Sequence, residues 1–331
     1  MITIVDVAAE AGVSVATVSR VLNDSYTVSN ARKELVMKAI EKTGYVIPQR
    51  MKLAQRDAPG KIILIITGTL IGAIIDSIQC QASSHNYQTM TYSYHNKGDL
   101  ENLNQLLANL REKLAGVILL NSIDNSPEFQ NSLEDIPVIQ IGEPIFESRA
   151  NYTVYMDEIK MSYDAAEYLV KQGKKKIALL TMNPYSQTFF STDKREKGYF
   201  LSMLEHYEHV DYSLREYADV TIEGGFEAAL KLLERHPDVD SILCTQDAIA
   251  MGALHALLTR GIPVTKIQPF SLDYNEVWEL FHPFLPYIDC HQEQLGTAAF
   301  FMLHNLLTQE VMTDCYQIIP HDIIIKSARP V

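Results

Sequence analysis

The amino-acid sequence predicts an α/β fold: an N-terminal three-helix headpiece that contains a helix-turn-helix, followed by a two-lobe body of parallel sheets. Three observations lead to this prediction. Three short amphipathic helical patterns fill the first 45 residues, and short apolar runs then alternate with longer helical patterns. The length of 331 residues also exceeds what one hydrophobic core ordinarily takes. The expected divisions are a headpiece at 1–45, a linker at 46–60 and the body at 61–331.

Polar residues and glycines mark the ends of the three headpiece helices. Each helix begins after a hydroxyl residue suited to an N-cap, and two of them end at a glycine, which accepts the left-handed conformation of a C-cap. The expected caps are Thr3 (in a capping box with Asp6), Ser14, Ser29, Gly12 and Gly44. The first two helices, joined by a tight turn, form a helix-turn-helix, whose second helix typically lies in the major groove of DNA.

The exposed positions of the second helix are suited to reading base edges. Arg20 supplies a bidentate donor pair for guanine, whereas Val15 and Ala16 offer apolar contact to a thymine methyl group. Hydroxyls at helix starts can hold phosphate oxygens. The candidate DNA-binding residues of the headpiece are Thr3, Ser14, Val15, Ala16, Thr17, Arg20, Asn23 and Ser29. The alternative is a three-helix bundle in which Ser14 and Ser29 act only as caps.

Charge is distributed unevenly along the chain. The net charge of −13 argues against a protein that coats nucleic acid through bulk electrostatics. Residues 1–56, however, hold eight basic and five acidic residues, which leaves 20 basic and 36 acidic residues for the remainder. A basic head on an acidic body lets one end approach phosphates, although a solvated helical face would explain the same charges.

Specific sequence matches add a family resemblance. The segments TIVDVA at 3–8 and AGVSVATVSRVLN at 11–23 resemble the head of the LacI/GalR family of bacterial repressors. Weaker matches continue to the C-terminus: VYMD at 154–157, REKGY at 195–199, TQDAIAMG at 245–252, FSLD at 270–273 and HQ at 291–292. The resemblance implies a periplasmic-binding-protein-like body that binds a small effector and forms dimers.

The linker departs from the pattern of that family, in which Pro-Asn precedes a short hinge helix whose leucine enters the minor groove. Here Pro48 is one residue late and Gln49 replaces the asparagine. Either Met51 or Leu53 would then be the apolar wedge that kinks DNA. The candidate hinge residues are Arg50, Met51 and Leu53. A mobile linker through this segment is the alternative.

The body alternates predicted strands with predicted helices. The strands are expected at 62–66, 117–120, 138–141, 177–180, 242–244 and 270–272. The helices are expected at 71–86, 100–113, 162–172, 195–206, 225–235 and 248–260. Such a series predicts parallel sheets covered on both faces, and at least six strands suggest two lobes.

Polar segments follow the predicted strands, where open parallel sheets bind ligands and two lobes form a cleft. In the family, the residues matching Arg195 and Asp273 contact the effector. A forked cation and a carboxylate can together hold the vicinal hydroxyls of a sugar. The candidate effector-binding residues are Leu70, Asn121, Ser191, Arg195, Gln246, Asp247, Asp273 and Trp278.

Several of these residues have structural alternatives. Asp247 is suited to be the N-cap of the next helix, and Arg195 would otherwise be a surface helix residue. Trp278 would either line the cleft or pack in the core. The stacking tryptophan of lactose-binding relatives aligns near 219–220, where this chain has no aromatic residue, so the resemblance does not imply galactoside specificity.

The chain lacks the sequence motifs that are typical of other classes of protein. The chain shows no dinucleotide, phosphate-loop or nucleophile-elbow motif, so an enzyme is not expected. The four cysteines are far apart and are interpreted as reduced, mostly buried thiols. His206 and His209 are the closest histidine pair, without a nearby cysteine, so neither a metal nor another cofactor is predicted. No apolar run is long enough to span a membrane and no secretory signal is present, which predicts a cytoplasmic protein.

These observations favour one function over its rivals. We expect a regulator that binds inverted-repeat operator DNA as a homodimer or tetramer and represses carbohydrate-utilisation genes. A small ligand, expected to be a sugar or sugar derivative, would control it as an inducer. A corepressor-dependent regulator is the alternative, ahead of a solute-binding protein or an enzyme of similar architecture.

Overall fold

A computed structural model describes most of the chain, which forms two compact units. The described residues are 2–22, 29–45, 60–68, 72–94, 97–120, 126–142, 152–183, 192–207, 209–274, 285–309 and 314–325. Unit 1 contains Met1–Thr153 and Gly296–Cys315, and unit 2 contains Val154–Leu295 and Tyr316–Val331. The backbone therefore passes between the units three times. Two lobes that were each formed by one continuous segment would need only one passage.

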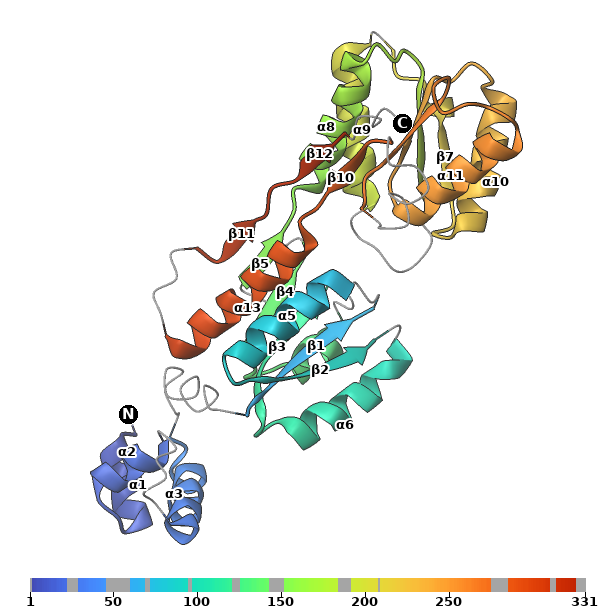
Figure 1. The fold of residues 1–331 in the computed structure, drawn as a ribbon. Helices are drawn as coiled ribbons and strands as arrows, with labels where there is room; N and C mark the ends of the chain where they lie inside the picture. Colours follow the sequence, from blue (N-terminus) through green and yellow to red (C-terminus); the bar gives the residue numbers. More distant parts are fainter. Residues whose placement is uncertain are drawn as a thin grey trace. The chain divides into compact units, whose positions relative to one another are not determined.

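The headpiece, within unit 1, consists of three helices. They are α1 (Ile4–Ala11), α2 (Val15–Leu22) and α3 (Asn30–Thr43) (Figure 1). The expected C-caps are confirmed, because Gly12 and Gly44 both adopt the left-handed conformation, with φ of 66° and 67°. Val18 and Leu22 are fully buried against α1 and α3, as the apolar pattern of the second helix predicts.

The rest of unit 1 contributes most of a six-stranded sheet in the order β11-β5-β4-β3-β1-β2, of which β11 and the last two residues of β5 belong to unit 2. Its strands are β1 (Ile62–Thr67), β2 (Gln88–Ser93), β3 (Leu114–Leu120), β4 (Val138–Ile141), β5 (Tyr152–Tyr155) and β11 (Tyr316–Ile318). Its helices are α5 (Gly72–Ser84), α6 (Leu100–Leu110), α7 (Pro127–Ser132) and α13 (Gln292–Thr308). Leu64 and Ile66 face the core that α6 and α7 cover, while α5 and α13 lie together on the other side of the sheet (Figure 1).

Unit 2 contains a second six-stranded sheet, in the order β12-β10-β9-β8-β6-β7. Its strands are β6 (Ile177–Met182), β7 (Arg215–Ala218), β8 (Ser241–Cys244), β9 (Gln268–Ser271), β10 (Tyr287–Asp289) and β12 (Asp322–Ile324). Its helices are α8 (Glu158–Lys171), α9 (Thr192–His206), α10 (Ile222–Arg235) and α11 (Asp247–Thr259). Successive residues of β6 alternate between two cores, since Leu179 packs beneath α8 and α9 whereas Leu180 packs beneath α10 and α11.

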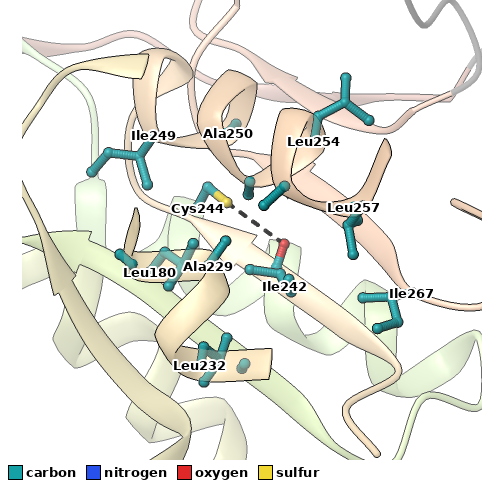
Figure 2. Close-up of a cluster of buried hydrophobic side chains, with 14 of the residues drawn as sticks. Leu180, Ala229, Leu232, Ile242, Cys244, Ile249, Ala250, Leu254, Leu257 and Ile267 are labelled. Carbon is teal, nitrogen blue, oxygen red and sulfur yellow. Dashed lines mark hydrogen bonds between the residues drawn. The ribbon is translucent and has the colours of Figure 1, made fainter. Parts of the chain in front are cut away.

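The core beneath α10 and α11 is closely packed. Cys244 lies at its centre, surrounded by aliphatic side chains such as Ile249 and Leu254, with its thiol 3.9 Å from the carbonyl oxygen of Ile242 (Figure 2). Burial raises the pKa of Cys244, so its thiol stays protonated. Cys290 is also buried, but Cys80 and Cys315 are exposed, so the expectation of mostly buried thiols is wrong for half of them.

All six predicted strands and all six predicted body helices are present, with small shifts at their ends. Six further strands are also present, namely β2, β5, β7, β10, β11 and β12. The sheets are not wholly parallel, because β10 and β12 pair in antiparallel register. Within the described ranges, we find no helix with the length and hydrophobicity that a bilayer crossing requires.

Candidate functional site

The strand order of unit 2 places a ligand-binding edge near β6 and β8. The chain proceeds from β6 outward to β7 on one side, and from β8 outward to β9 on the other. Open α/β sheets bind ligands outside the carboxyl ends of the strands at such a switch point. The helix α9 follows β6 and begins at this edge of the sheet, so the first turn of α9, which contains Arg195, lies there.

Arg195 is buried at this edge and joins four segments of unit 2. Its Nε and Nη2 donate to the two carboxylate oxygens of Glu158 on α8, with 3.2 Å between Nη2 and Oε1. Its Nη1 donates to the carbonyl oxygen of Thr245, after β8, and to Oδ2 of Asp273, after β9, at 2.9 Å. Only 7% of Arg195 is exposed, so the alternative of a surface helix residue is wrong.

The surroundings shift the pKa values of Arg195 and Asp273. Burial opposes the charge on Arg195, but the carboxylates of Asp273 and Glu158 outweigh it and hold the pKa of the guanidinium well above its usual value. Burial raises the pKa of Asp273, and the negative charges of Glu158 and Asp247 raise it further, while Arg195 acts in the opposite direction. The pKa of Asp273 is therefore above normal even though a guanidinium lies beside it.

Gln246 and Asp247 lie at the start of α11, beside this site. Gln246 is the N-cap residue, and its Oε1 accepts a hydrogen bond of 2.6 Å from the Thr245 hydroxyl. Asp247 is the first helical residue, and its Oδ1 accepts from the N–H of Ala248 at 2.8 Å. The interpretation of Asp247 as the N-cap is wrong by one residue, because the capping position belongs to Gln246.

The sequence-based site omitted Glu158. Glu158 directly follows Asp157, which caps α8 by accepting from the N–H of Lys160 at 2.9 Å. An acidic residue just after a cap resembles an ordinary helix start, so nothing local indicates a partner on another helix. Four predicted effector residues lie outside the described residues: Leu70, Asn121, Ser191 and Trp278. The same holds for Asn23, Arg50, Met51 and Leu53 of the DNA-binding set.

In the headpiece, α2 presents an exposed face that matches the predicted reading positions. Val15, Ala16 and Arg20 are exposed, while Thr17 is half-buried. The Ser14 hydroxyl caps the helix by accepting from the N–H of Thr17 at 3.1 Å, and it also lies 2.9 Å from the Thr17 hydroxyl. These two hydroxyls are thus already engaged with each other, so they fix the start of the helix.

The other two hydroxyl residues differ in how they cap. The N–H and the hydroxyl of Thr3 both donate to Oδ2 of Asp6, at 2.7 and 2.8 Å. This carboxylate contact is the reciprocal half of the expected capping box, which is present. Ser29 takes the backbone conformation of an N-cap at α3, but its side chain forms no capping bond.

No cluster of three or more potential metal-ligating side chains occurs among the residues that the structure describes.

Two family models match the chain and together span nearly all of it. Residues 3–48 match "Bacterial regulatory proteins, lacI family", and residues 72–327 match "Periplasmic binding proteins and sugar binding domain of LacI family". The chain belongs to the LacI family. It is therefore a DNA-binding transcriptional regulator with a helix-turn-helix headpiece, and the predicted fold class and the predicted role in transcriptional regulation are confirmed.

Relatives of this LacI-family regulator match it along nearly its whole length. The transcriptional regulator RegA of Clostridium saccharobutylicum is 27% identical over 329 residues, and catabolite control protein A of Priestia megaterium is 26% identical over 327 residues. Each match covers 97% of both chains. Among solved structures, the CelR–cellobiose complex has a TM-score of 0.71 at 24% identity and covers 98% of this chain and 99% of that one. A lac repressor dimer bound to operator has a TM-score of 0.69 at 22% identity, with 98% of both chains covered. These two likenesses concern the fold.

Proposed function

We propose that this LacI-family regulator binds an inverted-repeat operator as a homodimer and that a small polar ligand beside Arg195 and Asp273 changes its affinity for DNA. The observation that carries the proposal is the contact of buried Arg195 with half-buried Asp273, 2.9 Å apart, at the switch point of the unit 2 sheet. Buried ionic groups at such an edge are costly in a purely structural role. Their position therefore favours a ligand-binding role.

The chemistry of the pair favours a hydroxyl-rich ligand. Oδ2 of Asp273 accepts from Arg195, and no donor among the described residues reaches Oδ1. A carboxylate oxygen accepts charge-assisted hydrogen bonds from hydroxyl groups, which a sugar supplies in adjacent pairs. The description of the matched family model as a sugar-binding domain and the cellobiose bound by the similar CelR structure support a carbohydrate.

The headpiece supports the operator and dimer parts of the proposal. One helix-turn-helix covers only a half-site, so specific affinity at physiological salt needs a symmetric partner. The α2 helix offers Arg20 for guanine, and Val15 with Ala16 for a thymine methyl group. The similar lac repressor structure is a dimer on its operator.

The ligand would act by preferring the DNA-free form of the regulator. A coupling free energy of about 1–3 kcal/mol changes operator affinity by roughly five- to 150-fold. We propose an inducer, because release by its own substrate is useful to a regulator of carbohydrate uptake or breakdown. A corepressor would use the same residues with the opposite sign of coupling.

The test uses the full-length protein and two linked measurements. A thermal-shift screen of sugars, sugar phosphates and nucleobases identifies a ligand, and selection from random duplexes identifies the operator. Operator affinity is then measured with and without saturating ligand, and at least a fivefold decrease is expected. A fivefold increase would instead establish the corepressor alternative. Unchanged operator affinity at saturation would reject the proposal, and a ligand-binding chain that selects no duplex would indicate a solute-binding protein.

A further inference from the structure

Glu158 accepts two of the hydrogen bonds that Arg195 donates. A guanidinium has five N–H donors. Two of those of Arg195 donate to Glu158, one to the carbonyl oxygen of Thr245 and one to Asp273. Among the described residues, the one N–H of Arg195 without an acceptor is on Nη2, which leaves it for a ligand. The positive group that a phosphate or carboxylate would seek is thus already bidentately paired within the protein.

Negative charges outnumber positive charges around this guanidinium. Glu158 and Asp273 bond to Arg195 directly, and Asp247 is close enough to act on the ionisation of Asp273. Two carboxylates therefore bond to one guanidinium, which gives the group an excess of negative charge. Burial is the main cause of the raised pKa of Asp273, and Glu158 and Asp247 add to it.

The chain segments that directly follow β6 and β9 contain no lysine or arginine. The segment 184–191, which follows β6, contains no charged residue, and the segment 275–284, which follows β9, contains Glu276 and Glu279 but neither lysine nor arginine. These two segments therefore supply no second lysine or arginine.

We infer that Glu158 makes this site selective for uncharged or amine-bearing, hydroxyl-rich ligands and unfavourable for phosphorylated or carboxylated ones. The inference rests on the proposed function, since it requires the ligand to lie beside Arg195. An anion there would meet the carboxylates of Glu158 and Asp273 and compete with Glu158 for Arg195. A hydroxyl or ammonium group would instead donate to oxygens such as Oδ1 of Asp273.

The experiment compares matched sugars that differ in charge. Full-length protein is titrated calorimetrically with cellobiose and with glucose and galactose together with their 6-phosphates, uronates and 2-amino derivatives. We expect a neutral or amine-bearing member to bind at least tenfold tighter than the phosphorylated or carboxylated form of the same sugar. Glu158→Gln should reduce that ratio at least fivefold, because it removes one repelling charge and frees Arg195.

Two control variants separate charge from structure. Glu234→Gln makes the same charge change in a surface ion pair with Arg260 and should leave the ratio unchanged. Glu158→Asp keeps the charge and should retain the selectivity, so an equal loss in Glu158→Asp and Glu158→Gln would reject the electrostatic role. If Glu158→Gln does not fold, Asp247→Asn removes another carboxylate of the group and carries the same expectation.

The outcomes distinguish this inference from the proposed function. An anionic sugar that binds wild type more tightly than its neutral form would overturn the inference, and so would failure of every neutral and amine-bearing sugar to bind. The proposed function would still stand if such an anion changed operator affinity. Conversely, a neutral ligand with the expected Glu158 dependence and no effect on operator affinity would support the inference and reject the proposed function.

Discussion

Oδ2 of Asp273 lies 2.9 Å from Nη1 of Arg195, a residue 78 positions earlier in the chain. This contact connects the first turn of α9 to the end of β9, and the second contact of Arg195 with Glu158 extends it to the start of α8. Because Arg195 is buried, its charge is compensated by these carboxylates and not by water. The pair therefore matters to the stability of unit 2 as well as to the proposed site.

Arg195→Ala should destabilise the protein strongly. Removal of the guanidinium leaves Glu158 and Asp273 without their cation, and breaking a buried ion pair in this way typically costs about 3–5 kcal/mol. Urea denaturation would measure the free energy of unfolding. Arg260→Ala is the control, since Arg260 pairs with Glu234 on the surface, where such pairs contribute about 0–1 kcal/mol. Similar losses in both variants would contradict the buried role of Arg195.

Asp273→Asn should abolish the response to ligand while operator affinity without ligand stays within about twofold of wild type. Asparagine has the shape of aspartate, but it lacks the charge that strengthens hydrogen bonds from hydroxyls. Fluorescence anisotropy of a labelled operator, with and without the ligand found in the screen, measures both quantities. A folded variant that responds at unchanged ligand concentrations would show that the ligand lies elsewhere.

Arg20→Ala should lower specific operator affinity by about 1–3 kcal/mol and relax discrimination at one base pair in each half-site. Arg20 is exposed on α2, where a bidentate contact to guanine can form. Lys38→Ala is the control, because Lys38 is an exposed basic residue of α3 and loss of its charge should weaken specific and random DNA alike. Equal weakening of the two DNA types by Arg20→Ala would reject base reading.

Gly252→Ala should loosen the packing of α10 against α11. A Cβ atom at Gly252 would lie 2.2 Å from the carbonyl oxygen of Ile222 and 2.4 Å from the backbone nitrogen of Phe226. Backbone atoms cannot relieve such a clash by a change of rotamer, so we expect a loss of about 1–3 kcal/mol or more in the free energy of unfolding. Gly72→Ala is the control, because no neighbouring atom lies within 4 Å of its added Cβ. Equal unfolding midpoints for the two variants would contradict this packing.

Sequence reasoning succeeded where a signal is local and strong. The fully buried strands β3 and β6 read as continuous apolar runs, and Gly12 and Gly44 mark helix ends because left-handed residues favour glycine. The strand β2 was missed because its residues are exposed or half-buried, which leaves no apolar run. Edge strands such as β11 and β12, each of three residues, are too short to show a period.

The residues of the candidate site were also predicted only in part. Arg195 and Asp273 could be predicted because they match family motifs, but their 2.9 Å contact could not, since it depends on how distant segments pack. Glu158 was missed for that reason. The one-residue error at Asp247 reflects a helix that begins earlier than an aspartate cap suggests, with Gln246 in the capping position.

The capping box of α1 makes a final prediction, on the pH dependence of headpiece stability. Hydrogen bonds from the backbone N–H and the hydroxyl of Thr3 lower the pKa of Asp6. The unfolded chain, whose Asp pKa is about 3.9, therefore binds more protons than the folded one between the two pKa values. The stabilisation by Asp6 is thus complete above about pH 4 and is lost as the pH falls through the lower, folded value.

Hydrogen exchange of the α1 amides in the full chain measures this effect, because comparing variants at the same pH cancels the intrinsic exchange rate. Wild type should be more protected than Asp6→Asn above about pH 4, since asparagine keeps an acceptor but not the charge, and the difference should vanish as the carboxylate is protonated. Thr3→Val keeps the backbone donor to Asp6 and loses the hydroxyl donor. The difference in protection between wild type and Thr3→Val should therefore be smaller than that between wild type and Asp6→Asn over the same pH range. A difference between wild type and Asp6→Asn that stays constant from about pH 6 to pH 2 would mean that the carboxylate charge does not stabilise α1, and that shape alone accounts for the capping box.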